Sequence, residues 1–485
     1  MPLASESREE TQVFADTIFT IPQWFFLSFF IFQTVCSLFL ELISFHFLVR
    51  HLPRRVLDDL PRTQTGFEPQ ISILVPAYNE EQTIADSVRS LLQLQYAEFE
   101  IVVINDGSKD RTLDVLIEEF ELVPFPEAYP ANLQTERIRA VYLSKRNSKV
   151  RVIDKDNGGK ADALNVGINL SRNPLFCTLD SDSILQRDSL QRVVQPFLDD
   201  PSTVASGGTV RIANGCQVHA GYLTAVGLPA SWLGRFQVVE YVLAFWIGRL
   251  GWNPFNAMLI ISGAFGLFRK DTVVRVGGYA KGCHGEDMEL IVRLHRHLRL
   301  QGERYRISFV PHAFCWSEAP ENLRSLKSQR IRWQRGLSEA LLMNKQMLFH
   351  PRAGTVGWLS MPFMVLFEWL SPAVLVAGYL YAAVGCLMGL VSPASMVALL
   401  AAEIGMGILV SVSVLLVDEI AFHTYPEFKQ ARTLCAAAIL QNLGFRQLNA
   451  CWRLIGLWQS MTGAKVSWGS ITRTAAWRAS GAERP

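Results

Sequence analysis

The chain has 485 residues, enough for two or three structural units, and its 49% apolar content is high for a wholly soluble protein. Its 46 Lys and Arg residues nearly balance its 44 Asp and Glu residues, which excludes a general electrostatic attraction to nucleic acid. Eight cysteines lie far apart without a CxxC pair, so neither a zinc site nor a disulfide scaffold is indicated, and a reducing compartment is the simpler interpretation.

The first long apolar segment spans residues 21–50 and follows an N-terminal tail, residues 1–20. It exceeds the roughly 20 residues that cross a hydrocarbon core, so it predicts a transmembrane helix rather than a buried core helix. The tail is mainly acidic, whereas the segment is followed by a basic stretch that begins with Arg50 and His51. The positive-inside rule therefore predicts that the chain after this helix lies in the cytosol.

Residues 69–343 alternate short apolar runs with helical stretches, a pattern typical of a parallel α/β sheet. The runs ISILVPA, EIVVIND, KVRVID and LFCTLD lead to polar residues at Asn79, Asp106, Asp154 and Asp180. Ligands of such sheets bind beyond the carboxyl ends of the strands. We therefore expect these four residues to line a cleft.

Asp180 and Asp182 stand one residue apart after the last of these predicted strands. Two carboxylates at this spacing can share a hard divalent cation, whose open coordination positions then take diphosphate oxygens. A solvated acidic pair is the alternative, because such pairs are commoner on surfaces than metal sites. Asp106 has two interpretations as well, either a turn and cap or an acceptor for a nucleotide base.

Residues 157–165, NGGKADALN, begin with glycines and continue with helix formers. Backbone donors at a helix start, with Lys160 beside them, suit a phosphate or a ribose diphosphate. The segment lacks the GxxxxGK[ST] spacing of a P-loop, so ATP hydrolysis is not indicated.

Two later motifs also carry candidate chemistry. Asp287, next to Glu286, precedes a helical stretch and is either a cap or, in a cleft with a metal and an acceptor hydroxyl, a general base. In the basic segment QRIRW, Arg332 can steady a leaving diphosphate and Trp333 can offer a sugar a flat apolar face. The alternative for this segment is a basic helix on lipid headgroups.

The last third of the chain is apolar again. Residues 356–391 predict an interfacial or transmembrane helix, and residues 394–417 predict a transmembrane helix. Residues 431–458 carry a polar stripe, formed by Asn442, Arg446, Asn449 and Arg453. This helix therefore either lies in the membrane interface, the preferred interpretation, or lines a polar channel. The basic tail, residues 459–485, is expected in the cytosol.

Taken in order, VPAYNEE, INDGS, NGGKADALN, LDSDS, SGAFGLFRKD, GED and QRIRW resemble the motif series of the processive family 2 glycosyltransferases. The nearest groups are the poly-N-acetylglucosamine, chitin-oligosaccharide and hyaluronan synthases. The resemblance spans roughly residues 71–336. One departure is Gly285, where many members have Thr before the Glu-Asp pair, and it leaves the acceptor preference open.

The resemblance implies a GT-A fold, an α/β Rossmann-like domain flanked by transmembrane and interfacial helices, which binds a UDP-sugar with Mg²⁺ or Mn²⁺. The implied roles are as follows: Asp106, Lys160, Asp180 and Arg332 contact the nucleotide sugar, Asp180 and Asp182 hold the metal, Asp287 is the catalytic base, and Gln329, Trp333 and Glu286 contact the acceptor. The reaction would be one inverting displacement at the anomeric carbon.

The leading hypothesis is a multi-pass enzyme of the inner (plasma) membrane that extends a β-linked polysaccharide, UDP-GlcNAc being the favoured donor, processively and coupled to export. Its expected partners are the donor, the growing glycan, membrane lipids and a small membrane or export subunit, but no nucleic acid. The alternatives are transfer of a single sugar to a lipid carrier or glycolipid, and an inactive export scaffold.

Overall fold

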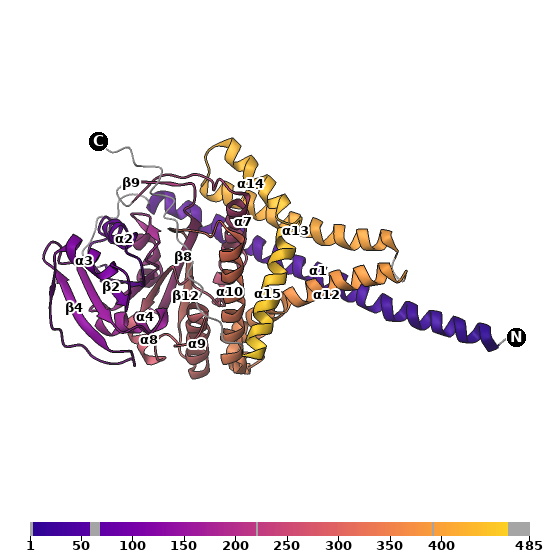
Figure 1. The fold of residues 1–485 in the computed structure, drawn as a ribbon, viewed down its shortest axis with the longest axis horizontal. Coiled ribbons are helices and arrows are strands. Elements are labelled where there is room, and N and C mark those ends of the chain that lie inside the picture. The colour runs from indigo at the N-terminus through magenta and orange to yellow at the C-terminus, as the bar shows by residue number, and fades with distance from the viewer. Residues whose placement is uncertain (1–2, 59–67, 220–221, 390–391, 464–485) are drawn as a thin grey trace.

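The computed structural model describes residues 3–58, 68–219, 222–389 and 392–463. Figure 1 shows three parts: a domain built on a twisted sheet, a layer of helices against its edge, and long helices that project away from it. Most of the predicted tail, residues 459–485, lies outside the described residues.

The main sheet has ten strands, and its third to sixth strands confirm the predicted parallel α/β core. In order across the sheet the strands are β3 (Leu122–Pro124), β4 (Ile138–Ser144), β5 (Val150–Lys155), β2 (Phe99–Asp106), β1 (Ile71–Ala77), β6 (Leu175–Leu179), β11 (Phe265–Arg269), β8 (Thr203–Ile212), β12 (Arg306–Ser317) and β7 (Ile184–Leu185). The outer strands make the sheet mixed, because β11 runs antiparallel to both of its neighbours and β4 runs antiparallel to β5. A separate ribbon pairs β9 (Gln217–His219) with β10 (Tyr222–Ala225).

Helices cover the sheet and position the motifs at its edge. Those of the sheet domain are α2 (Ile84–Leu91), α3 (Thr112–Phe120), α4 (Lys160–Leu170), α5 (Ser189–Val193), α6 (Gln195–Asp199), α7 (Trp232–Trp246), α8 (Lys270–Arg275), α9 (Glu286–Gln301) and α10 (Leu323–Met343), with 3₁₀ turns η1 (Leu250–Phe255), η2 (Lys345–Met347) and η3 (Pro351–Ala353). Buried side chains on nearly every position of α4 make it the central helix of the core. The motif NGGK lies at its start, so burial of this helix fixes the position of Lys160.

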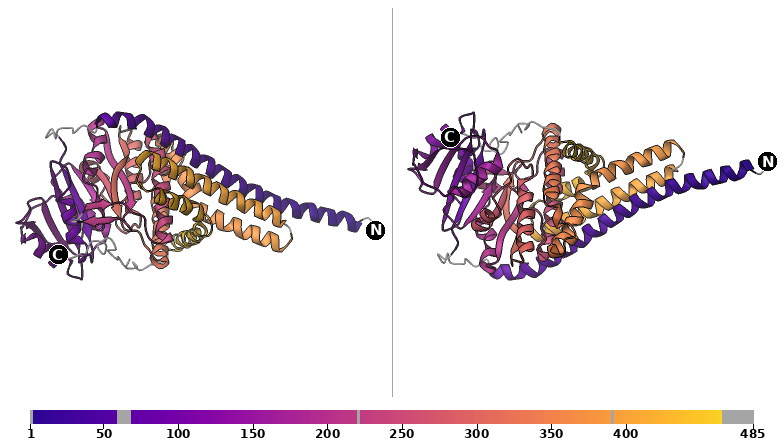
Figure 2. Two further views of the ribbon diagram at one scale, coloured as in Figure 1. Left: turned by 90° about the horizontal axis from the view of Figure 1, so that it is seen from above. Right: turned by 90° about the horizontal axis from the view of Figure 1, so that it is seen from below.

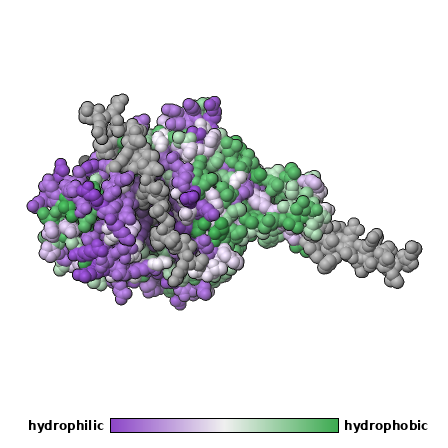
Figure 3. Space-filling model, in the orientation of Figure 1, coloured by the Kyte–Doolittle hydropathy of each residue, from purple (hydrophilic) through white to green (hydrophobic). Residues whose placement is uncertain are grey.

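Three apolar elements project from the domain (Figures 1 and 2). Helix α1 (Leu3–Asp58) includes an apolar stretch, Ile21–Arg50, and α13 (Pro393–Phe422) is a second helix long and apolar enough to cross a membrane. A third candidate is a broken element, bent by 42°, that joins π-helical turns η4 (Val356–Ser360) and η5 (Met364–Trp369), with α11 (Met361–Phe363) between them, to α12 (Ser371–Leu387). The view in Figure 3 shows apolar residues gathered over the projecting part, which associates this chain with a membrane.

The structure differs from the sequence prediction at residues 431–458. Two helices occupy this segment, α14 (Phe428–Leu440) and α15 (Phe445–Thr462), because the chain turns at Gly444, whose φ of 108° favours glycine. The polar stripe does not face outward. Asn442 is 1% exposed, Asn449 donates to Glu240 at 2.7 Å, and Arg453 donates to Gln334 at 2.8 Å. A stripe turned toward protein groups agrees with a polar interior better than with lipid headgroups.

Gln334 and Arg453 also supply hydrogen-bond donors to the backbone at the bend in the third apolar element. Pro372 and the π-turn leave backbone carbonyls near residue 369 without helical donors. Gln334 donates to the Trp369 carbonyl at 3.1 Å, and Arg453 donates to the Glu368 carbonyl. Helices α10 and α15 are thereby tied to the projecting helices.

A buried ion pair makes a second tie between the sheet domain and α13. Arg211 of β8 forms two hydrogen bonds of 2.8 Å with Asp418, and the side chains are each 4% exposed. The Trp246 indole N–H donates to the same carboxylate at 2.8 Å. The Asp418 carboxylate thus accepts three hydrogen bonds from the sheet domain, and removing either partner would leave a buried charge unpaired, which is strongly destabilising.

Candidate active site

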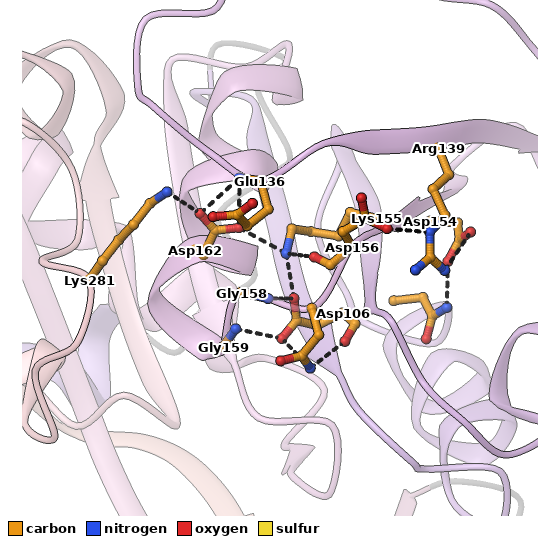
Figure 4. Close-up of polar contacts among 12 residues, drawn as sticks. Asp106, Glu136, Arg139, Asp154, Lys155, Asp156, Gly158, Gly159, Asp162 and Lys281 are labelled. Carbon is orange, nitrogen blue, oxygen red and sulfur yellow. Dashed lines mark hydrogen bonds and ion pairs between the residues drawn. The ribbon is translucent and has the colours of Figure 1, made fainter.

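Asp106 lies at the end of β2, and its carboxylate accepts hydrogen bonds from other residues of the chain (Figure 4). Its carboxylate accepts from the Lys155 ammonium and from the backbone N–H groups of Gly158 at 2.9 Å and Gly159 at 2.8 Å. The Asn157 amide adds a bond of 3.2 Å. These bonds fix the NGG segment against β2. The proposed contact of Asp106 with a nucleotide stays a prediction.

Lys155 is fully buried between two carboxylates (Figure 4). Besides Asp106 it pairs with Asp162 of α4 at 2.8 Å, and Asp162 also pairs with Lys281 at 2.6 Å. Burial raises the pKa of Asp162, but the hydrogen bonds from Lys155 and Lys281 outweigh burial and leave its pKa lowered. Lys155 and Asp162 thus form the charged support beneath the NGGK turn, a role that the sequence motifs alone did not indicate.

The four residues at the predicted strand ends differ in exposure. Asp106 is 4% exposed and Asp154 is 7% exposed, and Asp154 accepts from Asn105 at 2.7 Å. Asn79 is exposed, and Asp180 is half-buried. Both carboxylates are engaged by protein cations, Asp106 by the buried Lys155 and Asp154 by the half-exposed Arg139 at 3.7 Å, and the expected cleft stays a prediction.

Lys160 joins motifs that lie far apart in the sequence. Its ammonium is 2.6 Å from Asp180 and 3.7 Å from Glu286. Burial opposes the charged form, but attraction to Asp180 and Glu286 outweighs burial and raises the pKa of Lys160 above its ordinary value. Burial raises the pKa of Glu286, although Lys160 lowers it in part. The structure thus brings Lys160, Asp180 and Glu286 together, as a shared site requires.

Asp182 has the chemistry of a metal ligand. Burial raises its pKa to about 7, and repulsion by the Asp180 and Glu318 carboxylates adds to this effect. A divalent cation bound by Asp182 would stabilise its ionised carboxylate against both burial and the repulsion by neighbouring carboxylates. Within the described residues no group of three or more His, Cys, Asp or Glu side chains could hold a metal by itself. Two carboxylates with open positions fit a cation that is completed by diphosphate oxygens.

Asp287 lies at the first turn of α9, where the helix dipole favours a negative charge. One carboxylate oxygen accepts from the Met288 N–H at 2.8 Å, and the other accepts from the Gly263 N–H at 3.0 Å. A Cβ on Gly263 would lie 3.1 Å from the Lys160 ammonium and 3.4 Å from the Asp287 carboxylate. Gly263, in the segment SGAFG, therefore both orients Asp287 and leaves room between Asp287 and Lys160.

Helix α10, which packs between α9 and α15, carries the QRIRW residues. Trp333 is 41% exposed, with the Arg330 guanidinium 4.5 Å from its ring centre and the Tyr241 ring 6.3 Å away. Gln329 is 9% exposed, and its carbonyl oxygen has no hydrogen-bond partner in the described part of the chain. Arg332 is half-buried on the same helix. Their roles toward diphosphate and acceptor stay predictions.

Arg249 is a candidate site residue that the motifs missed. Its guanidinium lies 4.1 Å from the ring centre of Phe245, and its Nε is buried without a partner among the described residues. Burial lowers the pKa of Arg249 to about 10, while Asp287, Tyr241 and Glu368 attract its charge. A single Arg after an apolar stretch carries no sequence signal, so only the fold reveals its position near Asp287.

Two family models match the chain: Glycosyl transferase family 2 over residues 72–128 and Glycosyl transferase family group 2 over residues 175–411. The poly-beta-1,6-N-acetyl-D-glucosamine synthase of Staphylococcus aureus strain COL is 31% identical over 319 residues, which cover 65% of this chain and 66% of that protein. The chain belongs to glycosyltransferase family 2. The synthase of the same name from Staphylococcus epidermidis is 30% identical over 56% of this chain and 55% of its own length. Both matches span less than two thirds of the relatives' lengths.

The fold agrees with this family. A mannosyltransferase from Pyrobaculum calidifontis, solved with GDP-Man and Mn²⁺, superposes with a TM-score of 0.52 and 16% identity, over 87% of this chain and 99% of that one. At that identity the likeness concerns the fold alone, and it confirms the predicted GT-A architecture. As a family 2 glycosyltransferase, the chain is an enzyme whose candidate site is the cluster around Lys160, Asp180 and Asp287.

Proposed function

We propose that this family 2 glycosyltransferase extends a β-linked polysaccharide from a UDP-sugar, with UDP-GlcNAc as the favoured donor, processively and at a membrane. The observation that carries the proposal is the convergence of Lys160, Asp180, Glu286 and Asp287 at one point, from three separate segments. The donor preference is supported by the 31% identity to a poly-beta-1,6-N-acetyl-D-glucosamine synthase.

On the donor side, Asp180 and Asp182 would hold Mg²⁺ or Mn²⁺, which supplies charge stabilisation to the departing diphosphate. Lys160 carries a positive charge firmly, because its pKa is raised, and so can hold a phosphate oxygen beside Asp180. Arg332 is the candidate for the second cation at the diphosphate. Asp106 accepts from the Gly158 and Gly159 N–H groups and so fixes the turn that precedes Lys160.

On the acceptor side, Asp287 would take the proton of the attacking hydroxyl. Two backbone N–H bonds orient its carboxylate, so the base is in place before the substrates arrive. The hydroxyl oxygen then forms a bond to the anomeric carbon as the bond to the diphosphate oxygen breaks. One displacement of this kind inverts an α-linked donor into a β-linked product. Gln329, Glu286 and Trp333 would hold the acceptor sugar.

Processivity and export are supported by the connection between the acceptor helix and the apolar helices. Gln334, next to Trp333, contacts both the broken apolar element and Arg453 of α15. A glycan leaving Trp333 would therefore meet the polar stripe of α15 and the bent element. The proposal also includes a multi-pass position in the plasma membrane with the sheet domain in the cytosol, and contact with lipids and a small export subunit.

The test is incubation of the purified, detergent-solubilised protein with a panel of radiolabelled UDP-sugars and Mg²⁺ or Mn²⁺, followed by sizing of the product. A long polymer from one donor is the expected result, and it names the sugar. A single transferred residue would instead favour glycosylation of a lipid. UDP-sugar binding without turnover in the presence of membranes and acceptor would contradict the proposed activity.

A further inference from the structure

Helix α10 touches the start of helix α9 through two glycines. A Cβ on Gly336 would lie 2.7 Å from the Cα and N atoms of Gly285, and a Cβ on Gly285 would lie 2.9 Å from the backbone of Gly336. Both neighbours are backbone atoms, so neither position accepts a side chain unless the two segments separate. The two backbones are therefore in direct contact, and this contact accounts for the glycine before the Glu-Asp pair.

A pair of hydrogen bonds lies beside this contact. Glu339, almost one helical turn after Gly336, accepts from the His284 backbone N–H at 2.7 Å and from its imidazole Nδ1 at 2.8 Å. Both side chains are mostly shielded, with exposures of 22% for His284 and 27% for Glu339. One carboxylate thus fixes both the backbone and the side chain of the residue before Gly285.

These contacts lie between the segments that carry Asp287 and Trp333, the two groups whose separation matters most for the proposed transfer. Gly285 stands two residues before Asp287, and Gly336 stands three residues after Trp333 and four after Arg332, on the same face of α10. Any movement of α10 relative to α9 at this point would change the distance from Trp333 to Asp287.

We propose that His284, Gly285, Gly336 and Glu339 form a clasp that sets the position of the acceptor helix relative to the catalytic carboxylate. This inference rests on the proposed function, in which Asp287 is the base and Trp333 holds the acceptor. The clasp residues are positioning residues, since none of them contacts the reacting atoms. A misplacement of about 1 Å between reacting groups can lower a rate on the order of 100-fold.

The first variant to test is Gly336→Ala, with Gly405→Ala as the matched control. Gly405 is also inside a helix, but a Cβ there would meet nothing within 4 Å. We expect Gly336→Ala to lower kcat for polymer synthesis roughly 10- to 100-fold while the Kd of UDP stays unchanged. We also expect more UDP-sugar hydrolysis per sugar transferred, because water does not need α10 to reach the donor.

A second pair of variants keeps the proposal falsifiable if Gly336→Ala fails to fold. Glu339→Ala removes both bonds to His284, whereas Glu339→Gln keeps an oxygen acceptor for the backbone N–H and should restore most of the transfer. A clasp with only a structural role would lower protein yield or thermal stability but leave kcat and the hydrolysis ratio of the folded enzyme unchanged. Equal kcat and hydrolysis ratios in Gly336→Ala, Glu339→Ala and Gly405→Ala would overturn the proposal. Absence of polymer from the wild-type enzyme would instead count against the proposed function.

Discussion

The two sides of the candidate site differ in how fully the protein satisfies its own polar groups. On the nucleotide side, the carboxylates of Asp106 and Asp162 are met by Lys155, Lys281 and backbone N–H groups. Along α10, by contrast, polar atoms of Gln329, Arg330 and Arg335 are buried without hydrogen-bond partners in the described part of the chain. The carboxylates of the nucleotide side are paired, with Asn105 Oδ1 as an unpartnered neighbour, whereas α10 carries four such atoms in the described part of the chain.

The difference has a physical consequence for binding. An unpaired buried polar atom costs about 1–3 kcal/mol, so a ligand or water that pairs with it recovers that free energy. A nucleotide bound as proposed would meet a prebuilt turn and lose little to reorganisation. An acceptor glycan offers many hydroxyl groups, which both donate and accept, and so it suits the side that α10 leaves unpaired. We infer that the nucleotide side is built for a fixed ligand and the α10 side for a moving one.

The largest effect is expected where the two sides meet, at Asp287. Asp287→Asn removes the base and should lower glycosyl transfer by roughly 10²- to 10⁴-fold. UDP binding should stay near the wild-type value, because the substitution leaves the donor-side residues unchanged and the amide oxygen keeps one of the two N–H bonds, from Gly263 or Met288. Radiolabel incorporation and calorimetric titration with UDP measure the two quantities. A variant that loses transfer and UDP affinity together would show that Asp287 serves the nucleotide side instead.

A large effect on stability is expected on the nucleotide side, at Lys155. Lys155→Met leaves the buried Asp106 and Asp162 carboxylates without their common cation, and breaking a buried pair in this way costs about 3–5 kcal/mol. Lys145→Met, at an exposed lysine, is the control. Chemical unfolding of the solubilised protein should show a lower midpoint for Lys155→Met alone. Equal midpoints for the two variants would mean that the nucleotide side does not depend on this buried cation.

The nucleotide side was also the easier one to predict from sequence. ISILVPA and LFCTLD specify β1 and β6 because buried parallel strands read as unbroken apolar runs. The antiparallel strand β11 lies far along the chain from its partner β6, and short apolar runs carry no information about strand direction. The motifs likewise identified Lys160 and Asp180, but Arg249 and the Gly285–Gly336 contact depend on how distant segments pack. Local sequence patterns therefore predicted the strands and motif residues that depend on a single segment, but not the contacts between distant segments.

An intermediate effect is expected on the unpaired side, at Arg249. Arg249→Met keeps an unbranched side chain but removes the guanidinium, which lies over the Phe245 ring and is attracted by Asp287 and Glu368. The guanidinium donates to the Ala244 carbonyl at 2.9 Å, so the loss at the site is of charge attraction alone, and interaction energies of about 0.5–3 kcal/mol between neighbouring residues predict a fall in polymer synthesis on the order of 10-fold. Titration with UDP should give an unchanged Kd. A weakened UDP affinity would place Arg249 at the diphosphate and shift the boundary between the two sides.

The smallest effect is expected at Trp333, the ring proposed to hold the acceptor sugar. Trp333→Ala removes an aromatic surface, and such ring contacts contribute about 0.5–1.5 kcal/mol beyond area burial, which corresponds to a few-fold weaker hold on the acceptor. Because each sugar added gives the chain a new chance to dissociate, a few-fold change should appear as a shorter polymer rather than as lost initiation. Trp232→Ala is the matched control, since Trp232 is 44% exposed and has Arg235 4.9 Å from its ring centre, much as Trp333 has Arg330. Polymers of equal length from both variants, sized on the same gel, would remove Trp333 from the acceptor path and leave the unpaired atoms of α10 to hold the glycan alone.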